Sequence, residues 1–160
     1  MSSEIMSLEM DVFCLLLLIR ILYQMYINRE QNDHWNYFYY TIAWACVYLF
    51  MDAIWIMNVK HFLTFSKIQS GIFNSFYFCS LAMLVCSWYV YVQKTLHSAV
   101  LKHKKILVLT FIPLIFFIGS SLLSYWTHGL FVIDQAGNYH RGKLLPFYFL
   151  ILFAYILYLS

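Results

Sequence analysis

Charged side chains are scarce in this sequence. Asp, Glu, Lys and Arg make up 11% of its 160 residues, whereas a soluble domain usually carries about a quarter. Glycine and proline are also few, five and two residues, and no flexible or Pro-rich linker is visible. Apolar residues dominate instead, since 63% of the chain is hydrophobic and 21% is aromatic. These proportions exclude a soluble globular domain and predict one integral membrane domain over residues 1–160, with the lipid bilayer as its solvent.

Reactive and metal-binding residues are dispersed rather than clustered. The four cysteines lie inside apolar runs and the six histidines are spread over the polar joints, so no disulfide framework or zinc site is expected. No G-x-S-x-G, phosphate-binding loop, H-E-x-x-H or pair of carboxylates marks a catalytic centre. No stripe of Lys and Arg marks a nucleic-acid interface. The sequence therefore predicts no catalytic residue, metal or cofactor in this segment and no nucleic-acid partner.

Long apolar runs divide the chain. A membrane-spanning helix needs about 20 predominantly apolar residues, and its backbone groups have to be hydrogen-bonded within the helix. Four complete runs and one incomplete run meet this requirement, at 10–27, 37–59, 68–92, 106–126 and 144–160. The expected fold class is therefore an all-α transmembrane bundle of five spans. Because the fifth run is still apolar at Ser160, we expect the chain to be part of a longer protein.

The basic residues between the runs predict an orientation. The densest cluster, at 102–105, holds three lysines and a histidine, and the positive-inside rule assigns it to the cytoplasm. Counting spans from this cluster gives an external N-terminus, an external joint at 133–142 and a fifth span that runs inward. The N-terminus is acidic and lacks a signal-peptide pattern, so the first span is expected to stay in the membrane.

Asp52 is the strongest single functional signal, because a carboxyl group in the middle of a span costs about 2.5–3.5 kcal/mol to insert. Residues that recur every three or four positions share one helix face, and here they are Trp44, Tyr48, Asp52 and Trp55. This aromatic face with one acid is a candidate wall for a small amphipathic or cationic ligand. Asp52 is also a candidate ion-pair partner of Arg20. Alternatively, Arg20 extends to the cytoplasmic head groups, and Asp52 bonds a nearby Ser or Tyr and only fixes packing.

A second candidate site is the polar segment at 133–142, I-D-Q-A-G-N-Y-H-R-G, in which residues 134–137 are expected to form a turn. Arg141 offers a two-pronged partner for a carboxylate or phosphate, and His140 would make such a site sensitive to pH. The alternative is interfacial anchoring, with Arg141 and Lys143 at lipid head groups and the tyrosine in the aromatic belt. The candidate ligand-binding residues of this segment are Tyr139, His140, Arg141 and Gly142.

Three short motifs together resemble a bacterial architecture. They are M-D-A-I-W at 51–55, the basic joint at 102–105 that leads into a span containing Pro113, and N-Y-H-R-G at 138–142. On these motifs the chain is similar to the N-terminal multi-span sensor region of clostridial-type membrane diguanylate cyclases, the GGDEF family. A related region precedes some histidine kinases. The resemblance implies a seven-helix sensor domain with an external N-terminus and a cytoplasmic effector, of which this chain would be a truncated form.

The resemblance also assigns roles to particular positions. It matches Asp52 and Trp55 to the acid and the aromatic residue of the second span, and residues 139–142 to the loop motif. The family often has an aromatic residue shortly after that glycine, where this chain has Lys143 and two leucines. A sixth and a seventh span and the Gly-Gly-acid signature of the cyclase are absent from this sequence. Any cyclase or kinase activity would therefore belong to another part of the protein.

The expected function is that of a membrane-embedded sensor or input domain in the bacterial cytoplasmic membrane. An unknown small molecule or membrane signal would change helix packing, and the change would reach a downstream cytoplasmic effector. We hypothesise that the aromatic face with Asp52 and the loop at 139–141 line one outward-facing cavity. A homodimer is compatible with this function, because two cyclase sites must meet, although no small-x-x-x-small seam marks an interface.

Two alternatives from other classes stay open. One is a small membrane transporter or ligand-binding protein of the tryptophan-rich sensory type, although none of the Trp-Pro signatures of that family occurs here. The other is a structural membrane subunit. An end of the reading frame at Ser160 would favour either alternative over the sensor of a larger signalling protein.

Overall fold

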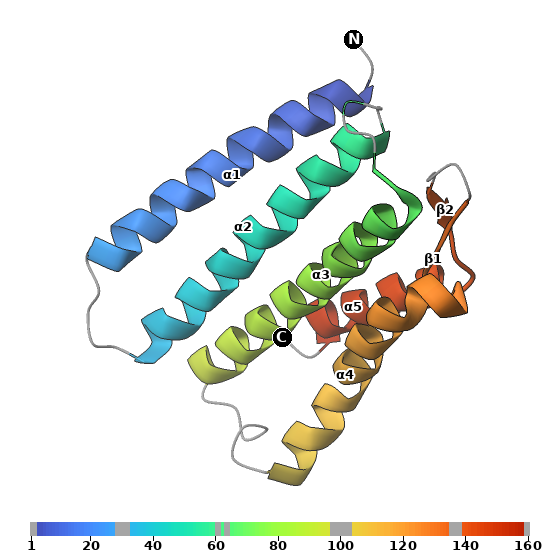
Figure 1. Ribbon diagram of the computed structural model, residues 1–160. Helices are drawn as coiled ribbons and strands as arrows, with labels where there is room; N and C mark the ends of the chain where they lie inside the picture. The colour runs from blue at the N-terminus through green and yellow to red at the C-terminus, as the bar shows by residue number, and fades with distance from the viewer. Residues whose placement is uncertain are drawn as a thin grey trace.

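The computed structural model describes residues 3–27, 33–59, 62, 65–96, 104–134 and 139–158. Over these residues it forms five helices and one small sheet (Figure 1). The helices are α1 (Ser3–Ile27), α2 (Asp33–Val59), α3 (Lys67–Thr95), α4 (Lys104–Thr127) and α5 (Leu145–Tyr158). The strands, both between α4 and α5, are β1 (Phe131–Ile133) and β2 (Tyr139–Arg141).

Three of the helices are long and apolar enough to cross a membrane, over Leu8–Ile27, Asn36–Asn58 and Lys67–Thr95. They support the predicted membrane location. The apolar stretches described in α4 and α5, Phe111–Thr127 and Leu145–Ile156, are shorter. Each predicted apolar run therefore contains a helix, but only the first three runs contain one that meets the requirement for a span within the described residues.

The first three helices lie side by side, with α2 between α1 and α3 (Figure 1). Helix α4 crosses α3 at a wider angle, and α5 packs against α3. The start of α1, the end of α2, the start of α3 and the β-hairpin lie at one end of the bundle. Helix α4 begins at Lys104 at the other end, so the hairpin and the start of α4 lie at opposite ends of the molecule.

A capping box explains where α3 begins, and a left-handed residue explains where α4 ends. At the start of α3, the Ser66 amide donates to Gln69 Oε1 at 2.9 Å and the Gln69 amide donates to Ser66 Oγ at 3.3 Å, which forms a capping box. After α4, His128 has a φ of 56°, and this left-handed residue stops the helix. The chain then enters β1 at Phe131, two residues after Gly129.

The β-hairpin corrects the expectation of an all-α fold. Strands β1 and β2 pair antiparallel, with Val132 opposite His140 and Ile133 opposite Tyr139. The base of the hairpin is closed by two further bonds, from the Gly142 amide to the Leu130 carbonyl at 2.8 Å and from the Leu144 amide to the Gly129 carbonyl at 2.9 Å. Residues 135–137 of the predicted turn at 134–137 lie outside the described residues. The polar character of the segment predicted a turn but not the strands beside it, because three-residue strands carry too few positions for a periodic pattern.

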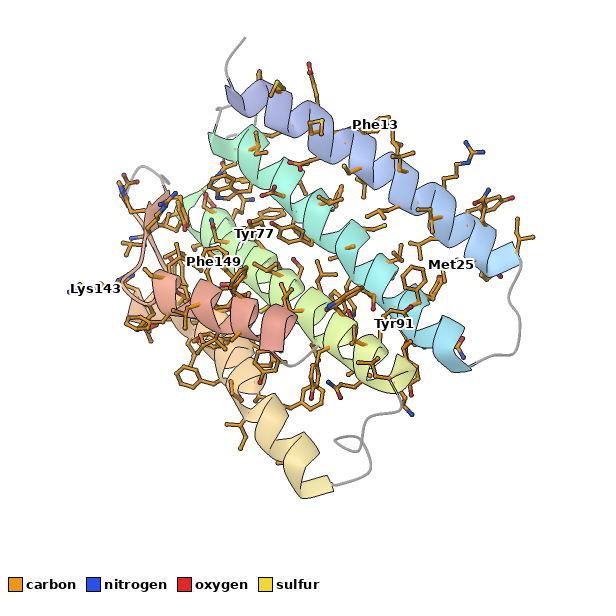
Figure 2. All side chains as sticks on the ribbon, turned by 180° about the vertical axis from the view of Figure 1, so that it is seen from behind. Phe13, Met25, Tyr77, Tyr91, Lys143 and Phe149 are labelled. Carbon is orange, nitrogen blue, oxygen red and sulfur yellow. The ribbon has the colours of Figure 1, made fainter. Side chains whose placement is uncertain are left out.

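The core lies beneath this hairpin, where α3, α4, α5 and β1 meet (Figure 2). The Phe78 and Phe131 rings stack with centroids 6.0 Å apart, and Tyr148 of α5 meets Phe78 edge-on at 5.4 Å. The Tyr148 hydroxyl donates a hydrogen bond to the Phe78 carbonyl, which joins α5 to α3. Ser124 Oγ of α4 accepts from the amides of Leu130 at 2.8 Å and Phe131 at 3.1 Å. The hairpin is thus attached to the helices by buried hydrogen bonds as well as by apolar packing.

Candidate functional site

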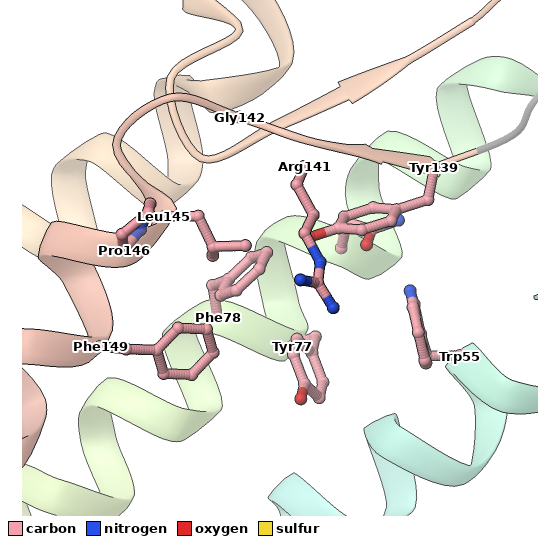
Figure 3. Close-up of a pocket in the computed structure, with 10 residues that line it drawn as sticks. Trp55, Tyr77, Phe78, Tyr139, Arg141, Gly142, Leu145, Pro146 and Phe149 are labelled. Atoms are coloured by element: carbon pink, nitrogen blue, oxygen red, sulfur yellow. The ribbon is translucent and has the colours of Figure 1, made fainter. Parts of the chain in front are cut away.

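A cavity of about 440 Å³ lies under the hairpin, between β2 and helices α2, α3 and α5 (Figure 3). This volume falls in the range of about 300–1,000 Å³ that is usual for small-molecule sites. The cavity is close to the helix ends, because Trp55 is one turn before the end of α2 and Leu145 is the first residue of α5. Its lining residues are Trp55, Asn74, Tyr77, Phe78, Tyr139, Arg141, Gly142, Leu145, Pro146 and Phe149.

The alternation of side chains along β2 decides which loop residues reach the cavity. Successive residues of a strand point to opposite sides, so Tyr139 and Arg141 share one side and His140 takes the other. Tyr139 and Arg141 line the cavity. The His140 side chain is 62% exposed, and its Nε2 lies 3.5 Å from Asp134 Oδ2. The predicted loop residues are therefore divided, and His140 is not part of the cavity.

Aromatic rings from three separate elements form the wall. Trp55 of α2 stacks on Tyr77 of α3 with ring centroids 6.4 Å apart, and Tyr139 of β2 meets Trp55 edge-on at 5.7 Å. Tyr77 continues this series to Tyr48, whose ring lies 5.4 Å away and whose hydroxyl is 3.3 Å from the Tyr77 hydroxyl. Tyr48 does not itself line the cavity. From the predicted aromatic face of α2, Trp55 lines the cavity directly. Tyr48 of the same face contacts the lining residue Tyr77.

Arg141 brings a positive charge to the cavity. Its guanidinium points into the space between Tyr139, Trp55 and Tyr77 (Figure 3). Within the described part of the chain, no carboxylate lies within 4.0 Å of this group. Burial raises the pKa of the Tyr139 phenol and the nearby Arg141 charge lowers it in part, so the phenol is neutral at physiological pH. The mouth of the cavity therefore offers a guanidinium and a phenol hydroxyl.

Asn74 contributes a buried polar group that the sequence interpretation overlooked. Its side chain is 2% exposed, and its amide nitrogen donates to the Ser70 carbonyl at 2.8 Å, one turn earlier in α3. Its amide oxygen has no hydrogen-bond partner among the described residues. An isolated amide inside an apolar run is the sequence signal that identifies such a position. The other lining residues that were not predicted are apolar or aromatic, and their sequence context does not separate them from residues that face lipid.

Asp52 lies beside the cavity rather than in its lining. Its carboxyl group is within hydrogen-bonding reach of Tyr77 and of Asp11 in α1. An ionised carboxylate accepts hydrogen bonds but donates none, so a hydrogen bond between the two acids requires one of them to be protonated. The expectation that the chain has no pair of carboxylates was therefore wrong. Asp11 is near the start of α1 and Asp52 near the end of α2, and antiparallel helices bring such positions to the same depth.

The candidate ion pair between Arg20 and Asp52 is not formed. Arg20 is exposed and lies nine residues beyond Asp11 in α1, which is about 13 Å along the helix axis. The α1 residue that lies beside Asp52 is Asp11 instead. Trp44 is half-buried in α2 and is not a lining residue of the cavity. The structure thus brings together Trp55, Tyr139, Arg141 and Gly142, and leaves Trp44, Tyr48, Asp52 and His140 outside the lining.

The described residues contain no group of three or more His, Cys, Asp or Glu side chains that could hold a metal ion. The cavity offers groups suited to recognition, namely one guanidinium, one amide oxygen without a hydrogen-bond partner among these residues, and a set of aromatic faces. No known family model, curated protein sequence or solved structure matches this chain.

Proposed function

We propose that this chain is the membrane-embedded sensor domain of a signalling protein and that it binds a small molecule in the cavity under the hairpin. All five helices cross the bilayer in this proposal, with the hairpin outside the cell. The observation that carries it is the cavity itself, where Arg141 and aromatic side chains from α2, α3 and β2 surround one space. A few convergent polar groups in a mostly apolar pocket are typical of ligand sites.

Tyr77 supports a route from the cavity to the rest of the bundle. It lines the cavity, and it also contacts Asp52 of α2, which in turn lies within hydrogen-bonding reach of Asp11 of α1. A ligand that moves the Tyr77 ring therefore changes contacts of three helices at once. If the bundle has two arrangements of these helices, the ligand shifts the population toward the one that it binds better.

The effector part of the proposal rests on the resemblance to the sensor regions of diguanylate cyclases. The positive-inside rule supports a cytoplasmic location for the start of α4, which lies at the end of the bundle opposite the hairpin. A ligand would then bind from outside and a cytoplasmic effector, either a diguanylate cyclase or a histidine kinase, would respond.

The first test is the DNA sequence downstream of codon 160. Two further apolar runs and a Gly-Gly-acid signature support a cyclase input domain, and a region with a phosphoacceptor histidine supports a kinase input domain. A stop codon at this point contradicts the proposal that an effector domain follows in the same protein. It would leave a small membrane protein, either of the tryptophan-rich sensory type or a structural subunit.

The second test measures the output of the complete protein in bacterial cells, as the cellular level of cyclic di-GMP or as kinase autophosphorylation. Arg141→Gln and Asp52→Asn are expected to change this output several-fold at equal membrane levels. Arg20→Gln removes the same charge from an exposed position outside the cavity and is the matched control. Unchanged output in both Arg141→Gln and Asp52→Asn would contradict the sensor function.

A further inference from the structure

We infer that the cavity under the hairpin takes a small monocarboxylic acid with an aromatic body and a hydrogen-bond donor. This inference rests on the proposed function and names the ligand class for the same site. It follows from three features of the cavity: one cation, one buried acceptor that has no hydrogen-bond partner in the described part of the chain, and aromatic walls.

The cation selects the charge of the ligand. Among the described residues that line the cavity, Arg141 is the only charged side chain, and no carboxylate neutralises it within 4.0 Å. A guanidinium binds a planar carboxylate through two parallel hydrogen bonds. Lys143, the next basic residue, does not line the cavity. One guanidinium balances one negative charge, which favours a monocarboxylate over a phosphate dianion.

The buried amide selects the second polar group of the ligand. Asn74 uses its nitrogen to bond the Ser70 carbonyl, and this bond leaves its oxygen as an acceptor. A buried acceptor without a partner is destabilising, and a donor that reaches it gains a hydrogen bond without competition from bulk water. A hydroxyl or amino hydrogen of the ligand fits this requirement. Because Asn74 and Arg141 both line the same cavity, one molecule is able to reach both.

The walls select the body of the ligand. Trp55 and Tyr77 are stacked on each other, and Phe78 and Phe149 also line the cavity (Figure 3). Aromatic rings pair best in offset-stacked or edge-to-face arrangements, and a ring of the ligand has four aromatic partners in this cavity. The cavity lining extends from the helix ends, at Trp55 and Leu145, to Phe78 about three turns into α3. The site thus fits a ligand with one apolar ring and one polar end.

The test uses the purified chain in lipid nanodiscs and three probes that differ by one group each. Phenyllactate carries the ring, the carboxylate and a hydroxyl donor, phenylpropionate lacks the hydroxyl, and phenylethanol lacks the carboxylate. Calorimetric titration is expected to show the tightest binding for phenyllactate. Phenylpropionate and phenylethanol are each expected to bind about tenfold more weakly, or weaker still, because each leaves one polar group of the site without its partner.

Two variants connect these differences to the residues. Arg141→Gln is expected to reduce phenyllactate affinity about tenfold or more, whereas Arg20→Gln leaves it unchanged. Asn74→Leu removes the acceptor at similar volume, so phenyllactate should bind this variant no better than phenylpropionate does. If Asn74→Leu does not fold, the comparison of phenyllactate with phenylpropionate on the unaltered chain decides the same point.

Several outcomes would overturn the ligand class. If phenylethanol binds as tightly as phenyllactate, the carboxylate does not contribute to binding. If phenylpropionate binds as tightly as phenyllactate, the hydroxyl donor does not contribute. Absence of binding by all three probes also overturns the ligand class. If Arg141→Gln still alters the output of the complete protein in that case, the sensor function stands with another ligand. Tight, Arg141-dependent binding without any effect on output would instead support the site and contradict the sensor function.

Discussion

Gly142 packs directly against the backbone of Gly129. A β-carbon at position 142 would overlap the Gly129 carbonyl oxygen and the Leu130 carbonyl carbon, neither of which is able to move without opening the base of the hairpin. The Gly142 amide also donates to the Leu130 carbonyl at 2.8 Å. This contact sets the position of β2, and therefore of Tyr139 and Arg141, over the cavity.

Gly142→Ala is accordingly expected to destabilise the fold by about 1–3 kcal/mol, the usual cost of overpacking a close contact. The matched control is Gly119→Ala, because a β-carbon at Gly119 meets no atom within 4 Å and alanine favours a helix. Denaturant unfolding in detergent micelles measures both changes. Equal stability of the two variants would show that the hairpin base tolerates a side chain.

Ser124→Ala is expected to loosen the hairpin from α4. Ser124 Oγ accepts from two buried amides, those of Leu130 and Phe131, and the alanine variant leaves both without this acceptor. Loss of a partner for a buried donor costs about 1–3 kcal/mol. Ser120→Ala is the control, because the Ser120 hydroxyl only donates to the Phe117 carbonyl within the same helix at 2.9 Å. Faster hydrogen exchange at the Leu130 and Phe131 amides in Ser124→Ala alone would support this attachment, and unchanged exchange would refute it.

Asp11 and Asp52 are expected to be energetically coupled. Neighbouring groups in one hydrogen-bonded network typically show non-additive effects of about 0.5–3 kcal/mol in a double-mutant cycle. Unfolding free energies of Asp11→Asn, Asp52→Asn and the double variant measure the coupling. The same cycle with Arg20→Gln and Asp52→Asn should be additive, because the structure separates these two residues. Coupling in the second cycle and additivity in the first would restore the ion pair that the sequence suggested.

The Tyr139 phenol is expected to titrate above the ordinary range of tyrosine, because burial raises its pKa more than the Arg141 charge lowers it. Removal of that charge in Arg141→Gln should raise the pKa further. Since the raised pKa favours the protonated folded state, its stabilising effect is present at neutral pH and is lost as the pH rises through this pKa. The difference in phenolate absorbance between the unaltered chain and Tyr139→Phe isolates this group. An unchanged pKa in Arg141→Gln would place the guanidinium away from the phenol.

The sequence located the helices better than it located the site. Apolar runs predict membrane helices because each backbone group in lipid has to be paired within its own segment, so composition alone marks the segments. The strand pair at 131–133 and 139–141 was not predicted, since strands of three residues carry too few positions for a periodic pattern. The side-chain register of β2 then decided that Arg141 reaches the cavity and His140 does not.

Asp52 also shows which properties follow from the sequence and which depend on packing. Its position in an apolar run established that it needs a partner, but the partner depends on which helix lies beside α2 and at what height. Sequence spacing suggested Arg20, and the packing of α1 against α2 brings Asp11 to that level instead. Asn74 and Phe149 became neighbours of Arg141 only because α3, α5 and β2 converge.

By itself, the sequence determined that this protein has apolar helices, that Asp52 requires a polar partner and that residues 133–142 interrupt the helices. These properties are local, because the hydrophobicity and hydrogen bonding of a segment do not depend on its neighbours. Only the tertiary structure decided the hairpin, the pairing of Asp52 with Asp11 and the cavity that Arg141 shares with Asn74. These three features depend on which helix and strand faces pack together and in what register. The apolar faces of this chain are too similar in composition to specify that packing.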